Sequence, residues 1–270
     1  MPVTDAPAKA RALYEARRTR VPIAPFTDAE PGLGMADGYA IQQELVPLLL
    51  ADGDTIVGHK VGLTSKPMQR MIGVDSPDHS PVLGSTVYAD GDVIDPANFI
   101  APKAEAEIVF VMGSRLAGPG VTVTAARQAI AGAVAGFEIV DSRIADWRIK
   151  LADTVADLAS CGAIVTSSRI VPLDDIDTRL LGMTLTRNGE LVDTGAGAAA
   201  LGDPVAVVAW LANVLGANGV ALEPGHIVMT GALHAAVPMA PGDVFRAEFD
   251  RLGPVTARVG RAARVEEETS

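Results

Sequence analysis

Three glutamates in the middle of the chain have residue types and spacing that suit a metal ion. Glu105 and Glu107 lie two residues apart in the run Pro-Lys-Ala-Glu-Ala-Glu-Ile-Val-Phe, which is typical of a strand because β-branched and aromatic residues follow the acidic pair. Residues two apart on a strand share a face and lie about 6.5–7 Å apart along the backbone. Both carboxylates could therefore reach one cation. Glu138 lies inside a second short apolar run, Ala135 to Asp141, where an unpaired buried carboxylate would be strongly disfavoured.

One hard divalent cation would satisfy all three carboxylates. Ligation by oxygen alone points to Mg²⁺ or Mn²⁺. The alternative is a solvated strand face on which Lys103 pairs with the acidic residues, while Glu138 lies apart at a sheet edge. The spacing alone leaves both interpretations open.

A lysine between glycines is the second candidate for chemistry. The segment Thr55 to Leu63 has strand character, and Gly58, Lys60 and Gly62 share one of its faces. Small neighbours leave room for a ligand to approach the lysine, which could act as a general acid or base or bind a carboxylate. The alternative is a lysine that protects an edge strand from aggregation. His59 points to the other face and is expected to pack or to form hydrogen bonds.

Two further segments carry polar groups of interest. Residues 64–92 are rich in proline and glycine and are expected to be irregular, and such segments are often functional. Asp78 and His79 are the polar residues there that best suit chemistry, although Asp78 could serve a turn instead. Farther along, the backbone amides of Gly231-Ala232-Leu233-His234 could hold an anion.

Composition limits the classes of function. The chain has 270 residues and a net charge of −11, which argues against nucleic acid or an anionic membrane as the partner. Its longest apolar runs are much shorter than the roughly 20 residues of a membrane span, and its polar N-terminus lacks a signal-peptide core. The single cysteine, Cys161, excludes an internal disulfide and a cysteine-rich zinc site. We therefore expect a soluble, cytoplasmic protein.

The elements that position these residues follow from the apolar patterns and the turn signals. Helices are expected over residues 5–18, 35–50, 122–135 and 203–217, and strands over 162–168, 227–230, 245–249 and 255–259. Asn188-Gly189 predicts a hairpin over residues 183–194. Residues 141–161 are expected to form a loop and a short helix over a pocket, or else a solvated surface with local ion pairs. The expected organisation is a helical arm (1–50), a β-rich catalytic body (51–260) and a disordered tail (261–270).

Several motifs follow one another along nearly the whole chain. They are Gly-His-Lys-Val-Gly-Leu-Thr, Glu-x-Glu, Phe-Glu-Ile-Val-Asp-Ser-Arg-Ile-Ala-Asp-Trp, Lys-Leu-Ala-Asp-Thr-Val-Ala-Asp, Gly-Ala-Gly-Ala-Ala-Ala-Leu-Gly-Asp-Pro and Thr-Gly-Ala-Leu. In this order they resemble the 2-keto-4-pentenoate (2-hydroxypenta-2,4-dienoate) hydratase family of the fumarylacetoacetate hydrolase superfamily. The resemblance implies an α+β fold with a mixed β-roll core and a helical, α/β N-terminal region. It also implies Mg²⁺ or Mn²⁺ and a homo-oligomer, often pentamers stacked as decamers.

The resemblance also implies roles for individual residues. The acidic metal triad of the family matches Glu105, Glu107 and Glu138, its active-site lysine matches Lys60, and its Pro-Asp pair places Asp78 in an active-site loop. We further assign Ser160 to the substrate carboxylate and Leu233 to the pocket wall. A lysine beside a cation could have a lowered pKa that suits proton transfer.

The chain departs from the family pattern at two places. His79-Ser80 stands where relatives commonly have an aromatic residue and glycine, and Leu158-Ala159-Ser160-Cys161 stands where they often read Asn-Ala-Ser-Ser. These changes affect the expected substrate more than the reaction class.

The implied reaction adds water to 2-hydroxypenta-2,4-dienoate and gives 4-hydroxy-2-oxopentanoate, in the meta-cleavage catabolism of aromatic compounds. The first alternative is a 2-oxo-3-hexenedioate (4-oxalocrotonate) decarboxylase, which should offer a second positive group for the distal carboxylate. A C–C bond hydrolase and a non-catalytic partner subunit are further alternatives. A pathway decarboxylase or aldolase is the expected partner protein.

Overall fold

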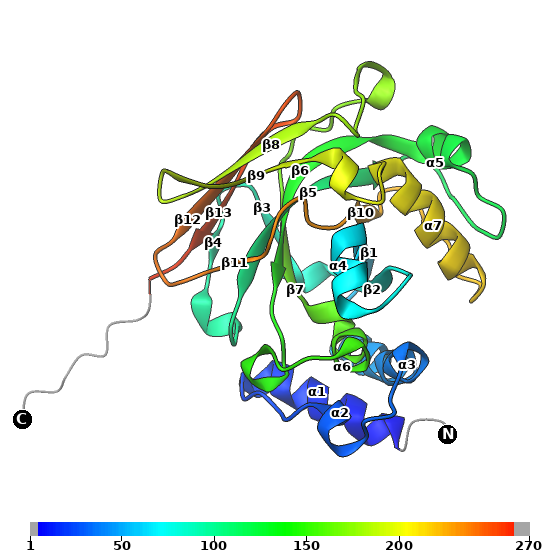
Figure 1. The fold of residues 1–270 in the computed structure, drawn as a ribbon, viewed down its shortest axis with the longest axis vertical. Coiled ribbons are helices and arrows are strands. Elements are labelled where there is room, and N and C mark those ends of the chain that lie inside the picture. The colour runs from blue at the N-terminus through cyan, green and yellow to red at the C-terminus, as the bar shows by residue number, and fades with distance from the viewer. Residues whose placement is uncertain (1–4, 262–270) are drawn as a thin grey trace, which may run out of the picture.

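Two mixed β-sheets form the centre of the molecule in a computed structural model that describes residues 5–261 (Figure 1). In order across the first sheet lie β2 (Asp78–Leu83), β1 (Ile56–Gly62), β10 (Ile227–Met229), β5 (Lys103–Met112), β6 (Ile130–Val140), β7 (Cys161–Thr166) and β3 (Val87–Ala89), and β11 (Val237–Pro238) pairs with β5. The second sheet contains β4 (Val93–Ile94), β13 (Gly253–Val259), β12 (Val244–Phe249), β8 (Gly182–Arg187) and β9 (Glu190–Ala196). This arrangement is the expected α+β fold.

The helices cover both faces of the first sheet. They are α1 (Ala6–Thr19), α2 (Phe26–Ala29), α3 (Met35–Ala51), α4 (Lys66–Ile72), α5 (Val123–Ala129), α6 (Leu151–Ala156) and α7 (Pro204–Gly216). Short 3₁₀ helices are η1 (Gly84–Thr86), η2 (Pro96–Asn98), η3 (Ala145–Trp147), η4 (Leu158–Ser160), η5 (Leu173–Asp175) and η6 (Gly197–Ala199). Helices α1, α2, α3 and α6 gather at one end of the molecule (Figure 1). The division into an arm and a body stays a prediction.

The alternation of side chains along β5 explains where the core and the acidic residues lie. Ala104, Ala106, Ile108 and Phe110 are fully buried in the core between the two sheets, which α5 and α7 extend. The other face of the first sheet packs against α1, α3 and α6 through residues such as Val109. Glu105 and Glu107 project from this second face, because side chains on a strand alternate with period two.

Helix α7 begins as the sequence predicts. The Asp203 side chain accepts a hydrogen bond from the Val205 amide, and Pro204 occupies the first turn. By length and composition, the helical stretch Gly197–Gly216 could cross a membrane, with a mean hydropathy of 1.6. Half of that stretch is buried inside the protein, and the core helix of a globular protein has the same properties.

Two expected segments differ in the structure. Residues 64–92 are not irregular throughout, since they contain α4, β2, η1 and β3. The helix expected over residues 122–135 ends at Ala129, and the chain continues as β6. Ladder pairing with β5 and β7 outweighs the helix propensity of the alanines there. The expected hairpin is confirmed, with Asn188 and Gly189 at positive φ in its turn. In the tail, residues 262–270 lie outside the described part of the chain.

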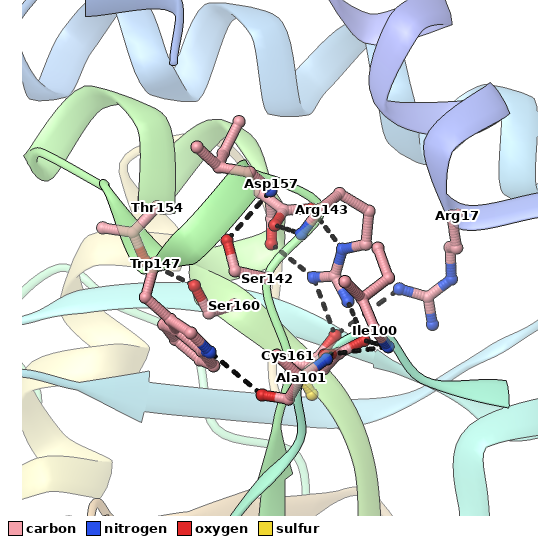
Figure 2. Close-up of polar contacts among 12 residues, drawn as sticks. Arg17, Ile100, Ala101, Ser142, Arg143, Trp147, Thr154, Asp157, Ser160 and Cys161 are labelled. Atoms are coloured by element: carbon pink, nitrogen blue, oxygen red, sulfur yellow. Dashed lines mark hydrogen bonds and ion pairs between the residues drawn. The ribbon is translucent and has the colours of Figure 1, made fainter. Parts of the chain in front are cut away.

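The segment from 141 to 161 is buried at its two ends, whereas Asp146, Arg148 and Lys150 in its middle are exposed. Arg143 and Asp157 are only 3% and 2% exposed, and Arg143 Nε lies 2.6 Å from Asp157 Oδ1 (Figure 2). The same guanidinium donates to the backbone carbonyls of Asp157 and Cys161. This buried ion pair fastens the turn after β6 to the start of β7.

Replacing Asp157 with alanine should therefore destabilise the protein strongly. The change leaves the Arg143 charge buried without its carboxylate, which typically costs about 3–5 kcal/mol. Urea denaturation of both proteins would measure the difference in the free energy of unfolding. Asp177→Ala is the matched control, because Asp177 pairs with Arg179 at the surface and its loss should change little. Equal effects of the two changes would contradict a structural role for the buried pair.

Candidate active site

The three glutamates predicted to bind metal converge on one point. Strands β5 and β6 pair so that Glu105 lies directly opposite Glu138, and Glu107 is the next residue on the same face of β5. One carboxylate oxygen from each glutamate lies within 4.8 Å of the others. Like charges directly opposite each other destabilise a sheet, so this arrangement requires a compensating positive charge.

Burial makes that requirement stronger. Glu107 and Glu138 are 0% and 1% exposed, while Glu105 is half-buried. Burial and the charge of Glu138 raise the pKa of Glu105 to about 7, and the same causes raise the pKa of Glu107. The Gly231 amide donates to Glu107 Oε2 at 2.8 Å, but Glu107 Oε1 and Glu138 Oε1 are buried without a hydrogen bond. Hard oxygen donors without partners, gathered at one point, fit a divalent cation.

Lys60 lies beside this acidic cluster. It is 4% exposed, and its Nζ donates to the Ala159 carbonyl at 2.7 Å and lies 3.4 Å from Glu138 Oε1. Burial disfavours the ammonium form, but the charges of Glu138 and Asp78 outweigh burial and raise the pKa of Lys60. The protein residues by themselves therefore hold the lysine protonated, and the lowered pKa expected for a lysine beside a cation stays a prediction.

Asp78 meets Lys60 because Gly62 has no side chain. Asp78 pairs with Gly62 across β1 and β2, and a Cβ on Gly62 would overlap Asp78 Oδ1 and lie 3.0 Å from Lys60 Nζ. Asp78 Oδ1 is buried without a hydrogen-bond partner, and burial raises the pKa of this carboxyl despite the nearby lysine. Asp78 is the first residue of β2, so it does not serve a turn.

A cavity of about 360 Å³ opens in front of the glutamates. Leu233 forms part of its wall, as do the segments 61–65 and 231–236. Lys60 and Asp78 are not among the described residues that line it, but Lys60 Nζ and Asp78 Oδ1 both lie next to Gly62, which does line it. Ser160 does not line the cavity either: its hydroxyl lies 3.0 Å from that of Thr154 (Figure 2).

The sequence missed His234 as a part of this site. His234 lines the cavity, and its Nε2 accepts a hydrogen bond of 2.8 Å from the amide of Ala106, the residue between Glu105 and Glu107. Its Nδ1 therefore carries the proton and donates to the Ala235 carbonyl at 2.6 Å. Both ring nitrogens are engaged by backbone, so His234 positions the acidic strand. No local signal reveals this contact, because the two residues are 128 positions apart.

Replacing His234 with alanine should weaken metal binding without unfolding the protein. The change leaves the Ala106 amide without its acceptor, at a cost of about 1 kcal/mol, and loosens the strand between the two ligands. Metal titration by calorimetry would measure the loss of affinity. His226→Ala is the control, since His226 also accepts a backbone amide, that of Glu223, but lies outside the cavity. Equal metal affinities in the two variants would contradict the positioning role.

Most of this chain is similar in sequence to known proteins. The family model described as fumarylacetoacetate (FAA) hydrolase C-terminal matches residues 50–260. A 2-hydroxyhexa-2,4-dienoate hydratase of Comamonas testosteroni is 41% identical, over 89% of this chain and 92% of its own length. A 2-keto-4-pentenoate hydratase of Paraburkholderia xenovorans is 42% identical, over 91% of both chains.

Solved structures give the same picture of the fold. The 4-oxalocrotonate decarboxylase from Pseudomonas putida G7, complexed with magnesium and adipate, has a TM-score of 0.92 and 36% identity, and covers 96% of this chain and all of its own. The fumarylpyruvate hydrolase from Pseudomonas aeruginosa, in complex with Mn²⁺ and pyruvate, has a TM-score of 0.61 and 18% identity, and covers 75% of this chain and 88% of its own. At that identity the second likeness concerns the fold alone.

Proposed function

The chain belongs to the fumarylacetoacetate hydrolase family and to its group of 2-keto-4-pentenoate hydratases, and from that premise we propose that it is a metal-dependent hydro-lyase. It adds water to 2-hydroxypenta-2,4-dienoate and forms 4-hydroxy-2-oxopentanoate. The observation that carries this proposal is the acidic triad, with Lys60 beside it, in a chain that is 41–42% identical to hydratases along most of its length.

We propose Mg²⁺ or Mn²⁺ as the metal, held by Glu105, Glu107 and Glu138. Three carboxylates favour a hard cation. Glu107 Oε1 would then gain a positive partner, and Glu138 Oε1 would gain a second one besides Lys60. When bound, such a cation supplies Lewis-acid polarisation of substrate oxygens. The positive charge of such a cation would also offset the repulsion among the three carboxylates.

Lys60 and Asp78 are the proposed proton-transfer groups. The reaction forms a C–O bond at C4 and C–H bonds at C5 and C3, while the C2 enol hydroxyl and the attacking water each lose a proton. The site therefore needs a group that gives protons and a group that accepts them. Lys60, held protonated by its acidic neighbours, is the donor. Asp78, whose Oδ1 lacks a partner, is the acceptor within reach of the same region. Leu233 shapes the wall beside the substrate, and Ser160 remains a proposed contact of its carboxylate.

Turnover by the purified chain tests the reaction directly. Loss of ultraviolet absorbance of 2-hydroxypenta-2,4-dienoate would be followed with Mg²⁺, with Mn²⁺ and after chelation, and the product identified by NMR. We expect metal-dependent loss of the dienol and formation of 4-hydroxy-2-oxopentanoate. If the dienol is consumed equally fast after chelation and dialysis, the metal-dependent mechanism is wrong.

The decarboxylase is the second candidate, favoured by the close structural match to 4-oxalocrotonate decarboxylase. A substrate with a distal carboxylate calls for a second positive group, yet none of the described residues that line the cavity is lysine or arginine. This absence favours the hydratase. Release of carbon dioxide from 2-oxo-3-hexenedioate, with no hydration of the dienol, would favour the decarboxylase over the hydratase. The absence of turnover with both substrates would favour a C–C bond hydrolase or a non-catalytic subunit.

The last part of the proposal concerns the assembly of the protein and its place in the cell. We propose a homo-oligomer, pentameric or decameric, that acts in the cytoplasm on a small-molecule substrate, with a pathway decarboxylase or aldolase as partner. Light scattering coupled to size-exclusion chromatography would give the number of subunits. A monomeric mass at working concentrations would contradict the assembly.

A further inference from the structure

A second cavity, of about 210 Å³, lies between the end of α1 and the first sheet. Arg17 in α1 and Arg20 directly after it line one side of the cavity, and Tyr88, Asn98, Asp141 and Arg143 lie on the side of the sheets. A single water takes up about 30 Å³ in the liquid, so the cavity has room for a small ion. It shares no described lining residue with the cavity at the glutamates.

No ion pair within 4 Å joins Arg17 or Arg20 to a carboxylate in the described part of the chain, although the charges of Asp157 and Asp54 act on Arg17 from farther away. Arg17 makes one long contact, 3.5 Å from its Nη1 to the Cys161 carbonyl (Figure 2). Arg20 Nε is buried without any hydrogen-bond partner. The neighbouring Arg143, in contrast, forms an ion pair, with its Nε 2.6 Å from Asp157 Oδ1. Arg17 and Arg20 are half-buried, and a polar group out of contact with water is normally paired, so the unpartnered Nε of Arg20 beside Arg17 points to a partner that comes from outside the chain.

The electrostatics of the cavity favour an anion. Burial and the charge of Arg143 lower the pKa of Arg17 to about 10, and the opposing charge of Asp157 does not offset them. Asp141 is the one carboxylate in the lining, and it already accepts hydrogen bonds from the amides of Ile100 and Ala101. The cavity therefore has uncompensated positive charge in a chain whose net charge is −11.

The remaining hydrogen-bond donors suit oxygen atoms. Two guanidiniums can each offer paired N–H groups to an oxoanion, and Asn98 adds an amide side chain at the same cavity. The hydroxyls of Ser85 and Thr86, which also line it, are already used by Asp54 and by the Leu83 carbonyl. We propose that this cavity binds a small dianionic oxoanion, such as phosphate or a short dicarboxylate, through Arg17 and Arg20.

An anion bound in this cavity should also affect the segment that positions Lys60. Arg17 contacts the carbonyl of Cys161, and Lys60 is held by the carbonyl of Ala159, two residues earlier. An anion that fixes Arg17 also fixes α1 against the segment that positions Lys60. The bound anion should therefore raise the melting temperature of the whole protein.

Binding of two probe anions to the metal-loaded protein tests the proposal. Calorimetric titrations with inorganic phosphate and with succinate, at constant ionic strength, would be compared for the wild type, Arg17→Gln and Arg20→Gln. Arg11→Gln is the matched control, because Arg11 is an exposed arginine of the same helix outside the cavity. We expect saturable binding at one site per chain, a Kd raised at least tenfold in both cavity variants, and no change in the control. Preference for one probe would identify a phosphoryl or a carboxylate ligand.

Three results would overturn the proposal. One is the absence of saturable binding of either anion to the wild type. Another is binding that is unchanged in both cavity variants, since the anion would then lie at the metal centre. The third is a loss of assembly in these variants without any anion effect, which would assign the arginines to a neighbouring subunit's acids. Should Arg17→Gln fail to fold, Arg20→Gln and Arg17→Lys keep the test decisive, with the lysine variant expected to retain part of the affinity.

Discussion

The Glu107→Gln variant is expected to lose metal-dependent turnover while its metal-free form stays folded and becomes more stable. Glutamine keeps an oxygen that can accept the Gly231 amide, and it removes one of three carboxylates that lie within 4.8 Å of one another. Since Glu107 is fully buried, its charge is a cost to the protein whenever no cation is bound. The same charge is what attracts the cation, so stability and metal affinity should change in opposite directions.

Calorimetry and thermal unfolding would measure the two quantities separately. The loss in metal affinity should exceed the roughly 10–100-fold that removal of an outer-shell partner typically causes. The rise in melting temperature on adding Mg²⁺ or Mn²⁺ should disappear. Glu190→Gln serves as the control, because Glu190 is exposed on β9. If metal affinity were unchanged in Glu107→Gln, the acidic cluster would have to be explained without a metal.

The Lys60→Met variant should lose turnover while it keeps its metal. Methionine fills most of the volume of the lysine stem but has no proton to give, and loss of a general acid or base typically lowers the rate by about 10²–10⁴-fold. Glu107 and its amide partner are not touched by this change. Metal affinity should therefore be retained or increase, because a positive charge 3.4 Å from Glu138 Oε1 has been removed.

Steady-state rates at saturating metal, together with metal titration, separate these effects. A fall in kcat at unchanged metal content would support proton transfer by Lys60. Lys150→Met is the matched control, since Lys150 is exposed and lies outside the cavity. Normal turnover in Lys60→Met would exclude Lys60 as the proton donor, and a loss of folding would be visible in the same samples by circular dichroism.

Local patterns in the sequence were enough for much of the fold. The Glu-x-Glu strand, the Asn188-Gly189 turn and the Asp203-Pro204 start of α7 are each confirmed by the structure. Each depends on residues within a few positions of one another, through side-chain alternation, positive φ or a capping hydrogen bond. Where longer-range pairing competes with local preference, as at the end of α5, the sequence prediction was wrong.

The amino-acid sequence by itself determined which residues could do chemistry: three glutamates for a hard cation, and a lysine between glycines that leave space beside it. Only the tertiary structure decided how these groups meet. The register of β5 and β6 places Glu105 opposite Glu138, and the pairing of Gly62 with Asp78 brings that acid to Lys60. His234 and Arg17 likewise make contacts with segments more than 100 residues away. The physical reason is that a local pattern sets the period and the ends of an element, whereas register and burial depend on the packing of the whole chain.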